Sequence, residues 1–386
     1  MRNPLNEKIV SIPPSGIRKF FDIVSEMKDA ISLGVGEPDF DTPWHIREEG
    51  IYSLEKGRTF YTSNAGLKDL KIEIHNYLER RCNVCYDPDH EIMVTVGGSE
   101  AIDAAMRAMI DPGDEVLIPQ PSYVSYTPCC VLADGVPVIL ELEEKDNFRL
   151  TPEKLLEKIT PKTKILVLPF PNNPTGAIME REDLEKIAEI VIEKDLYVIS
   201  DEIYSELTYA KEDHVTIASL PGMKERTVLI NGFSKAFAMT GWRMGYLAAD
   251  ARLILPMLKV HQYAVASSNI IAQSAAITAL QAGESCVEEM RREYARRRQF
   301  LLDAFAQIPE ISCVAPAGTF YIYPNISGTG LSGTEFADKF LMEAGVATVP
   351  GTAFDSFCNS HIRLSYASSM ESLQTAVSRL KGMLKK

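Results

Sequence analysis

The chain has 386 residues, of which 46% are hydrophobic and 24% are charged, proportions that exclude a disordered, collagenous or disulfide-stapled protein. At roughly 100 to 200 residues per domain, this length allows two or three domains. The 40 Lys and Arg residues against 53 Asp and Glu residues give a net charge of -13, an acidic balance that disfavours binding to nucleic acid or to an anionic membrane.

The first 45 residues are rich in Pro and Gly, with PPSG at 13–16 and LGVGEPDFDTP at 33–43. Such a segment argues against a long helix or a central strand. Two helices are predicted next. One covers residues 67–78, where apolar side chains recur at helical spacing, and the other begins at Ser99 and ends before the DPG sequence at 111–113.

Five short apolar runs predict buried strands, at residues 115–119, 164–168, 197–200, 227–230 and 245–249. Buried parallel strands appear as continuous apolar runs of this kind. A helix with Leu184, Ile187, Ala188 and Val191 on one stripe separates the second run from the third. This order is typical of an α/β fold, so we expect a large domain with a mostly parallel, doubly wound sheet over residues 46–280.

The pattern changes after Gly283. A charged helix over residues 284–305 interleaves Arg and Glu, which we interpret as a solvated helix face and not as a patch that binds nucleic acid. A strand at 320–323, a helix at 334–344, an alternating strand at 361–365 and a final helix follow. Ser368 and Glu371 predict a capping box for that last helix. These elements indicate a second, smaller α+β domain.

The seven cysteines, an odd number without a regular framework, favour a reducing compartment. Cys82 and Cys85 form the only CxxC pattern. Without a second pair or nearby histidines, we favour an ordinary turn over a metal site. The N-terminal sequence lacks the apolar core of a signal peptide, and no stretch approaches about 18 consecutive apolar residues. We therefore expect a cytoplasmic protein without a metal.

Polar residues at the carboxyl ends of the predicted strands are candidates for ligand binding, because open parallel sheets bind ligands there. Asn173 lies in PFPNNPTG, Asp201 ends the run before Tyr204, Lys235 follows the run at 227–230, and GGS at 97–99 opens a helix. Taken singly, each has a simpler explanation as a helix cap, a turn or a surface charge. Their convergence on one edge predicts a site.

The glycine-opened helix suits a phosphate, because free backbone N–H groups at a helix N-terminus bind anions. Arg243 could add a bidentate contact. Neither GxxxxGK[ST] nor GxGxxG is present, which weakens the nucleoside triphosphate and dinucleotide interpretations. A lysine facing a buried carboxylate is what pyridoxal phosphate needs, since the amine forms a Schiff base and the carboxylate keeps the ring nitrogen protonated.

The segment NGFSKAFAMTGWRMGY, residues 231–246, resembles the pyridoxal-phosphate attachment site of the class I aminotransferases. PFPNNPTG, SDEIYSEL and VGEPDFDTP are similar to other blocks of this family in the same order and spacing. The resemblance runs from about residue 30 to residue 365. It implies the fold type I of pyridoxal-phosphate enzymes, in which residues 1–45 and 281–386 would form a discontinuous small domain that closes on the substrate.

The resemblance also implies roles for individual residues. Lys235 would form the Schiff base with the cofactor, and Asp201 would pair with the pyridinium nitrogen. The phenolic oxygen of the cofactor would accept hydrogen bonds from Tyr204 and Asn173. Residues implied to contact the ring face or the phosphate are Tyr123, Gly98, Ser99, Ser234, Arg243 and, from a partner subunit, Tyr61.

The same resemblance implies that Arg363 binds the α-carboxylate of the substrate, with Gly36 in the same pocket. The alternation at 361–365 agrees, because it places Arg363 on the face opposite Ile362 and Leu364. In two places the chain departs from the family pattern. Gly232 stands where a phosphate-binding Ser is frequent, so Ser234 would take over that contact, and Ser99 stands where bacterial aspartate-specific enzymes carry a Lys.

The expected reaction is a ping-pong transamination that moves an amino group from an L-amino acid to a 2-oxo acid, with 2-oxoglutarate as the expected acceptor. The donors under consideration are N-acetyl-LL-diaminopimelate, an aromatic amino acid and aspartate; SDEIYSEL and residues 258–277 are most similar to enzymes of the acetyl-diaminopimelate type, followed by aromatic aminotransferases. The alternatives are a C–S β-lyase on the same fold and, ranked below it, a non-catalytic regulator that binds the cofactor.

The resemblance further implies a homodimer with shared active sites, completed by Tyr61. Substrate preference would depend on the pocket and on the segment at 10–22, where Ile17, Phe20 and Phe21 would either cover the substrate or pack on the small domain.

Overall fold

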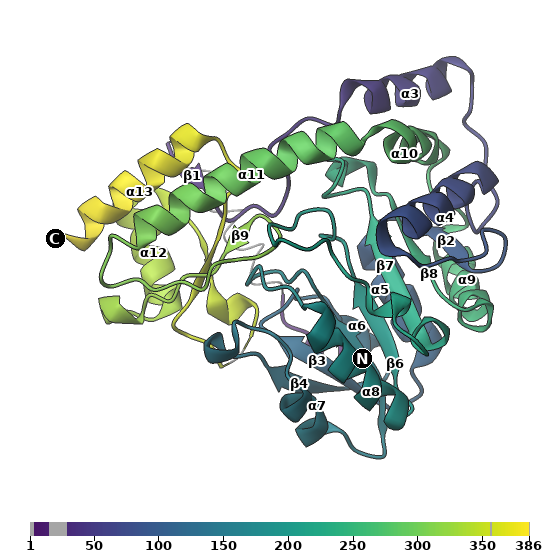
Figure 1. Cartoon of the computed structure of the whole chain (residues 1–386), viewed down its shortest axis with the longest axis horizontal. Coiled ribbons are helices and arrows are strands. Elements are labelled where there is room, and N and C mark those ends of the chain that lie inside the picture. Colours follow the sequence, from purple (N-terminus) through teal and green to yellow (C-terminus); the bar gives the residue numbers. More distant parts are fainter. Residues whose placement is uncertain (1–3, 15–28, 356, 386) are drawn as a thin grey trace.

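The computed structural model describes residues 4–14, 29–355 and 357–385, and a seven-stranded sheet lies at its centre (Figure 1). The strand order is β2-β8-β7-β6-β5-β3-β4. In that order the strands span Ile92–Thr95, Gly245–Ala248, Thr227–Gly232, Tyr197–Asp201, Thr163–Leu168, Glu115–Gln120 and Val136–Glu141. β8 runs antiparallel to both of its neighbours, β2 and β7, and all other neighbouring pairs are parallel. The five predicted strands and the mostly parallel α/β sheet are confirmed, and β2 and β4 complete the sheet.

Alternate residues of the central strands face opposite layers of helices, as the period of two of a strand requires. Val116 and Ile118 of β3 pack with α5 (Gly98–Met109), α6 (Tyr126–Leu132) and α9 (Ala251–Val265). Leu117 packs on the other face with α7 (Pro152–Lys158) and α8 (Arg181–Glu193). On that face, α4 (Lys68–Cys82) and α10 (Ile270–Ala282) pack over β2, β7 and β8. Both faces of the sheet are therefore covered, and the predicted double winding is confirmed.

The C-terminal elements form a further core beside the sheet (Figure 1). The antiparallel strands β11 (Val349–Pro350), β12 (Ile362–Ser365) and β9 (Tyr321–Ile322) pack with α12 (Gly333–Ala344), α13 (Met370–Leu384) and the long α11 (Glu284–Phe305). From the N-terminal part, β1 (Ile31–Ser32) pairs in parallel with β10 (Val346–Ala347), and Leu33 joins the same core. Segments from the two ends of the sequence therefore lie side by side.

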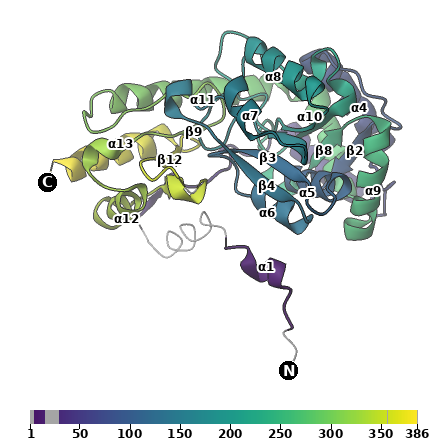
Figure 2. The same ribbon diagram turned by 90° about the horizontal axis from the view of Figure 1, so that it is seen from below.

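The remaining helices in the described residues are α1 (Glu7–Ser11), α3 (Trp44–Glu55) and the short 3-10 helices η1 to η6, at Glu144–Asp146, Ile217–Ser219, Lys224–Arg226, Thr240–Trp242, Ser327–Thr329 and Gly351–Ala353. α3 packs on α10. Figure 2 shows α1 on the outside of the molecule, beyond α6. It contacts α6, and its Lys8 pairs with Asp134 just after that helix. None of the helices in the described ranges is long and apolar enough to cross a membrane.

Two predicted helix starts differ from the structure. α5 begins at Gly98, one residue before the predicted Ser99. The capping box predicted from Ser368 and Glu371 is wrong, because Ser369 is the N-cap of α13 and its side chain accepts a hydrogen bond from the backbone N–H of Ser372. Two adjacent serines can each cap a helix, and the sequence does not distinguish them.

Candidate functional site

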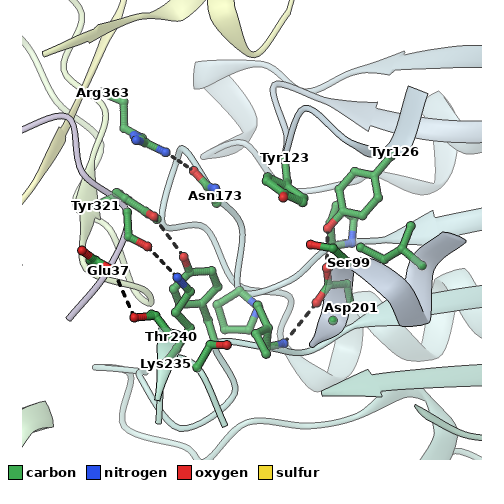
Figure 3. A pocket seen from close by; sticks show the side chains of 18 of the residues that line it. Glu37, Ser99, Tyr123, Tyr126, Asn173, Asp201, Lys235, Thr240, Tyr321 and Arg363 are labelled. Atoms are coloured by element: carbon green, nitrogen blue, oxygen red, sulfur yellow. Dashed lines mark hydrogen bonds between the residues drawn. The ribbon is translucent and has the colours of Figure 1, made fainter. Parts of the chain in front are cut away.

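A pocket of about 350 Å³ lies where the carboxyl ends of β5, β6 and β7 meet the start of α5 and the C-terminal sheet (Figure 3). The predicted site residues that line it are Gly36, Gly98, Ser99, Tyr123, Asn173, Asp201, Tyr204, Ser234, Lys235, Arg243 and Arg363. Figure 3 shows Arg363 and Asn173 at one end of the pocket and Asp201 with Tyr126 at the other. The structure thus brings together all the predicted residues except Tyr61.

The carboxylate of Asp201 lies at the end of β6, 7% exposed. Tyr126 donates a hydrogen bond of 2.7 Å to Oδ2, and the backbone N–H of Ile203 donates one of 3.2 Å to Oδ1. Burial raises the pKa of Asp201, while these two donors oppose the rise by stabilising the carboxylate. Tyr126 was not predicted. Its position three residues after Tyr123 is the only signal of its role in the sequence.

Lys235 follows β7 and lines the pocket, and its Nζ donates a 2.5 Å hydrogen bond to the carbonyl oxygen of Gly36. The side chain keeps part of its surface open to the cavity, yet the protein packed round the amine lowers its pKa to about 8 through burial. Nζ also lies 5.7 Å from the ring centroids of Tyr204 and Phe320. An amine with this pKa has a larger neutral fraction at physiological pH than an ordinary lysine, and the neutral form is the one that acts as a nucleophile or a general base.

The first turn of α5 and Arg243 form the basic wall of the pocket. Gly97 precedes the helix with a φ of 78°, and a Cβ there would lie 2.7 Å from Nη2 of Arg243. Gly97 is therefore required both by its left-handed backbone and by the approach of the guanidinium. Arg243 is held by a 3.0 Å hydrogen bond from Nη1 to the carbonyl oxygen of Thr240. Free N–H groups beside an arginine fit a phosphate.

Gly232, one of the two departures from the family pattern, has a packing reason. A Cβ at this position would lie 3.0 Å from both the Cα of Gly245 and the carbonyl oxygen of Met244. The backbones of β7 and β8 approach each other too closely here for a side chain to fit without displacement. Ser234 lines the pocket two residues later, as expected if it replaces the missing hydroxyl.

Arg363 lies on β12 with only 2% of its surface exposed. Its Nη1 donates to Oδ1 of Asn173 at 2.8 Å, and its Nη2 donates to the carbonyl oxygen of Gly34 at 2.6 Å. The guanidinium also stacks over Tyr321, 4.3 Å from its centroid. Burial lowers the pKa of Arg363, but a guanidinium remains charged. Its Nε is buried without a partner among the described residues, whereas Nη1 and Nη2 each keep a second N–H that could bind an anion in the pocket.

Tyr321 of β9 is a second pocket residue that was not predicted. Its hydroxyl lies 3.0 Å from that of Tyr204, and burial raises the pKa of both phenols. A Cβ at Gly36 would lie 2.4 Å from the same hydroxyl. Gly36 is therefore needed to let Tyr321 reach the pocket. An aromatic residue in a short strand looks like core in a sequence, which is why Tyr321 gave no signal.

The charges along the pocket wall are unevenly distributed. Its cations are Lys235, Arg243 and Arg363, and Glu37 adds a carboxylate that accepts a 3.0 Å hydrogen bond from Thr240. Apolar and aromatic residues form much of the remaining wall, namely Ile102, Tyr123, Tyr126, Pro169, Pro171, Ile203, Tyr204 and Tyr321. Within the described residues, no fourth cation lines the pocket.

Other predicted features lie outside this pocket. Tyr61 follows α3, is 91% exposed and does not line the pocket of its own chain, so its role across a dimer stays a prediction. Cys85 of the CxxC pattern is exposed, and no group of His, Cys, Asp and Glu in the described ranges could hold a metal ion. Ile17, Phe20 and Phe21 lie outside the described residues.

Comparisons with known proteins agree with this geometry. Residues 28–380 match the family model of aminotransferase class I and II. The chain is 45% identical over 383 residues to the aspartate aminotransferase of Pyrococcus abyssi (99% of this chain, 98% of that protein) and 42% identical over 383 residues to aromatic-amino-acid aminotransferase 2 of Thermococcus litoralis (99% and 98%). The structure of the aromatic aminotransferase from Pyrococcus horikoshii OT3 has a TM-score of 0.91 at 43% identity, covering 96% of this chain and 98% of that chain.

Proposed function

The chain belongs to the class I and II aminotransferases, and on this premise we propose that its amino donor is an aromatic or similarly apolar L-amino acid. The protein is a transaminase that uses pyridoxal 5'-phosphate and moves an amino group from an amino acid to a 2-oxo acid. The observation that carries the donor proposal is the number of positively charged side chains that line the pocket. Among the residues that the structure describes, three cations line the pocket, and each has a proposed partner other than a side-chain carboxylate.

The pocket fits the cofactor in charge and in shape. Asp201 is a buried carboxylate, and a cationic ring nitrogen beside it would stabilise its negative charge. Tyr123 lines the pocket and could stack on the ring. The first turn of α5 and Arg243 suit the phosphate, and Lys235 suits the carbonyl carbon. When bound, pyridoxal phosphate supplies an electron-withdrawing ring that stabilises negative charge at the Cα of the substrate.

Arg363 orients the substrate in this proposal. The second N–H groups of its Nη1 and Nη2 offer a planar pair of donors to an α-carboxylate. Asn173 and Gly34 fix the guanidinium through its other hydrogen bonds. A substrate held by Arg363 would lie in the same pocket as the amine of Lys235, as proton transfer by proximity requires.

Lys235 carries the proton transfer. With a pKa lowered to about 8 by burial, its amine is an effective base near neutral pH and an effective acid once protonated. It would remove the proton at Cα and return one on the cofactor side. Asp201, whose carboxylate accepts a hydrogen bond from Tyr126, would pair with the ring nitrogen and favour its protonated form. A 2-oxo acid then reacts in reverse in the same pocket, which predicts ping-pong kinetics.

The side-chain end of the pocket supports an apolar donor. Ile102, Pro169, Pro171 and the tyrosines offer apolar and aromatic surface, and the carboxylate of Glu37 would repel a second carboxylate on the substrate. Ser99 stands where a lysine would provide the missing cation. The relatives named for aromatic amino acids fit this proposal, whereas those named for aspartate make aspartate the decisive comparison.

We also propose a homodimer with two-domain subunits, divided into residues 46–280 and residues 1–45 with 281–386. An exposed apolar surface supports the dimer. Trp44, Leu54, Phe60 and Tyr61 on and after α3 are between 55% and 91% exposed, and such a surface marks an interaction site. Sedimentation of the active enzyme at twice the subunit mass is the expected result, and a fully active monomer would contradict it.

A donor panel tests the proposed function. Each amino acid is added alone to the cofactor-loaded enzyme, and the loss of the cofactor's absorption band is followed in single turnovers. Phenylalanine, tyrosine and tryptophan are expected to react with kcat/KM at least about 100-fold above that of aspartate, as for a missing charged contact of about 3 kcal/mol. Equal or faster reaction with aspartate or N-acetyl-LL-diaminopimelate would overturn the donor assignment. Pyruvate release without an oxo acid would indicate a lyase.

A further inference from the structure

The buried His261 of α9 and the partly buried Glu100 of α5 form a pair next to the turn proposed for the phosphate. Nδ1 of His261 lies 2.6 Å from Oε1 of Glu100, and its side chain is fully buried. The other carboxylate oxygen of Glu100 accepts a hydrogen bond from the backbone N–H of Val96. Neither His261 nor Glu100 lines the pocket, although Gly98 and Ser99 do. The pair therefore acts on the pocket only through the backbone of residues 96–100.

The position of Glu100 matters because it is the third residue of α5, after the N-cap Gly97. A glutamate there ordinarily turns back toward the N-terminus of its own helix, where it accepts an N–H group and is attracted by the helix dipole. That place is the one proposed for the phosphate. No side chain caps Gly97, so the first turn is open to either anion. A carboxylate in it would compete with the phosphate and repel it.

Glu100 instead bonds one residue further back, at Val96, which lies before the N-cap. His261 fixes it there from the α9 side. Nε2 of the same imidazole has no partner among the described residues, so the orientation of the ring is set by its contact with Glu100. The N–H groups of the first turn, at Gly98 and Ser99, consequently remain free of the carboxylate.

We propose that His261 is a positioning residue for the cofactor phosphate, because it holds the carboxylate of Glu100 away from the first turn of α5. This inference rests on the phosphate site of the proposed function. A purely structural pair between α5 and α9 is the simpler explanation. The two differ in one respect: a positioning role affects ligands that carry a phosphate, whereas a loss of packing affects cofactor binding in general.

The test measures equilibrium binding to the full chain freed of cofactor. The ligands are pyridoxal 5'-phosphate, pyridoxal without the phosphate, and inorganic phosphate as a competitor of the first. Substitution His261→Phe keeps a ring of similar size and removes the contact with Glu100. We expect it to weaken binding of pyridoxal 5'-phosphate and of inorganic phosphate about five- to tenfold, as expected for an anion displaced at a helix N-terminus, and to leave binding of pyridoxal unchanged.

The double variant E100Q/H261F is the matched control, since it contains the same change in the buried ring. With the charge at residue 100 removed, His261→Phe should have no further effect, and E100Q alone should bind phosphate ligands at least as tightly as the original chain. His261→Gln, whose amide can donate to Glu100, should restore binding to within about twofold.

Equal losses for pyridoxal and pyridoxal 5'-phosphate, or equal losses from His261→Phe with and without Glu100→Gln, would overturn the positioning role and leave the pair structural. A failure of the proposed phosphate site itself would look different. In that case the original chain would bind pyridoxal as tightly as pyridoxal 5'-phosphate, and inorganic phosphate would not compete.

Discussion

Arg363 offers the sharpest test of the site, because a lysine at this position keeps the charge and loses only the planar arrangement of donors. In the structure, Nη1 and Nη2 each give one N–H to the protein, at Asn173 and at the carbonyl oxygen of Gly34. Nε is buried and has no partner among the described residues. Nη1 and Nη2 each keep a second N–H, and a carboxylate in the pocket that Arg363 lines can accept hydrogen bonds from these two groups. The single amine of a lysine cannot serve Asn173, Gly34 and two carboxylate oxygens at once.

The expected loss follows from this count of donors. Arg363→Lys removes one charge-assisted hydrogen bond to the substrate, about 1.5 to 3 kcal/mol, and so should lower kcat/KM about 10- to 150-fold. Arg363→Met removes the charge as well and should cost about 2 to 5 kcal/mol, or about 30- to 5,000-fold. Both variants should bind pyridoxal 5'-phosphate as the original chain does, since Arg363 is assigned to the substrate and not to the cofactor.

Single-turnover rates with phenylalanine, measured over a range of concentrations, separate substrate affinity from the chemical step. Arg243→Lys is the matched control, because it makes the same exchange at the proposed phosphate site. It should weaken cofactor binding and leave the substrate affinity of the cofactor-saturated enzyme nearly unchanged. A value of kcat/KM within threefold of the original for Arg363→Lys, or equal cofactor losses in both variants, would refute the assignment.

Three further outcomes are expected. Burial lowers the pKa of Lys235 from 10.5 to about 8. Between these two pH values the unfolded chain binds more protons than the folded chain, so the free energy of unfolding rises with pH. In urea unfolding without cofactor, Lys235→Met should be about 2 kcal/mol more stable than the original chain at pH 7, and this difference should disappear by about pH 10.5; the variant should also be inactive. Tyr126→Phe removes the donor to Asp201 and should weaken cofactor binding about tenfold in equilibrium titrations, whereas unchanged affinity would contradict the role of Tyr126. Tyr61→Phe should weaken cofactor binding about fivefold without changing the sedimenting mass, and an unaltered affinity would remove Tyr61 from the partner's site.

The strands that could be predicted are those buried on both faces. β3, β5, β6 and β7 stand out as continuous apolar runs because helices cover each side of them. β4 was not predicted because it is the edge strand, partly exposed, and its sequence contains Pro137, which weakens any strand signal. Apolarity also carries no information on direction, so the antiparallel orientation of β8 could not be inferred from its residues.

The reversal of β8 has a consequence for the site. Because β7 and β8 run in opposite directions, the end of one and the start of the other lie at the same edge of the sheet, where Gly232 pairs with Gly245. The connection between them contains both Lys235 and Arg243, and both of its ends lie at that edge, so the two cations stay close to it. A parallel β8 would have required a long crossover and would have separated the two cations.

The site residues that could be predicted are polar residues that stand next to apolar strands in the sequence. Asp201 ends an apolar strand, and Asn173 and Lys235 lie in the connections that follow two others; each could be a cap, a turn or a surface charge, but their convergence on one sheet edge indicated a site. Tyr126 and Tyr321 were not predicted, because a tyrosine buries apolar surface and hides its hydroxyl function in the same side chain. Their roles become visible only when the fold places each hydroxyl within 3.0 Å of its partner, Asp201 or Tyr204.

The pocket is built so that its charged groups are only partly satisfied by the protein. Within the part of the chain that the structure describes, Asp201 has two donors for a carboxylate that can accept about four hydrogen bonds, and the Nε of Arg363 has no partner. Burial disfavours the charge on both Asp201 and Lys235, and so moves the pKa of the acid up and that of the base down. Such half-satisfied groups cost stability in a closed interior. A sequence that keeps all of them in one pocket gains from that arrangement only through a ligand that carries a cationic ring nitrogen, a carbonyl group and anions at both ends.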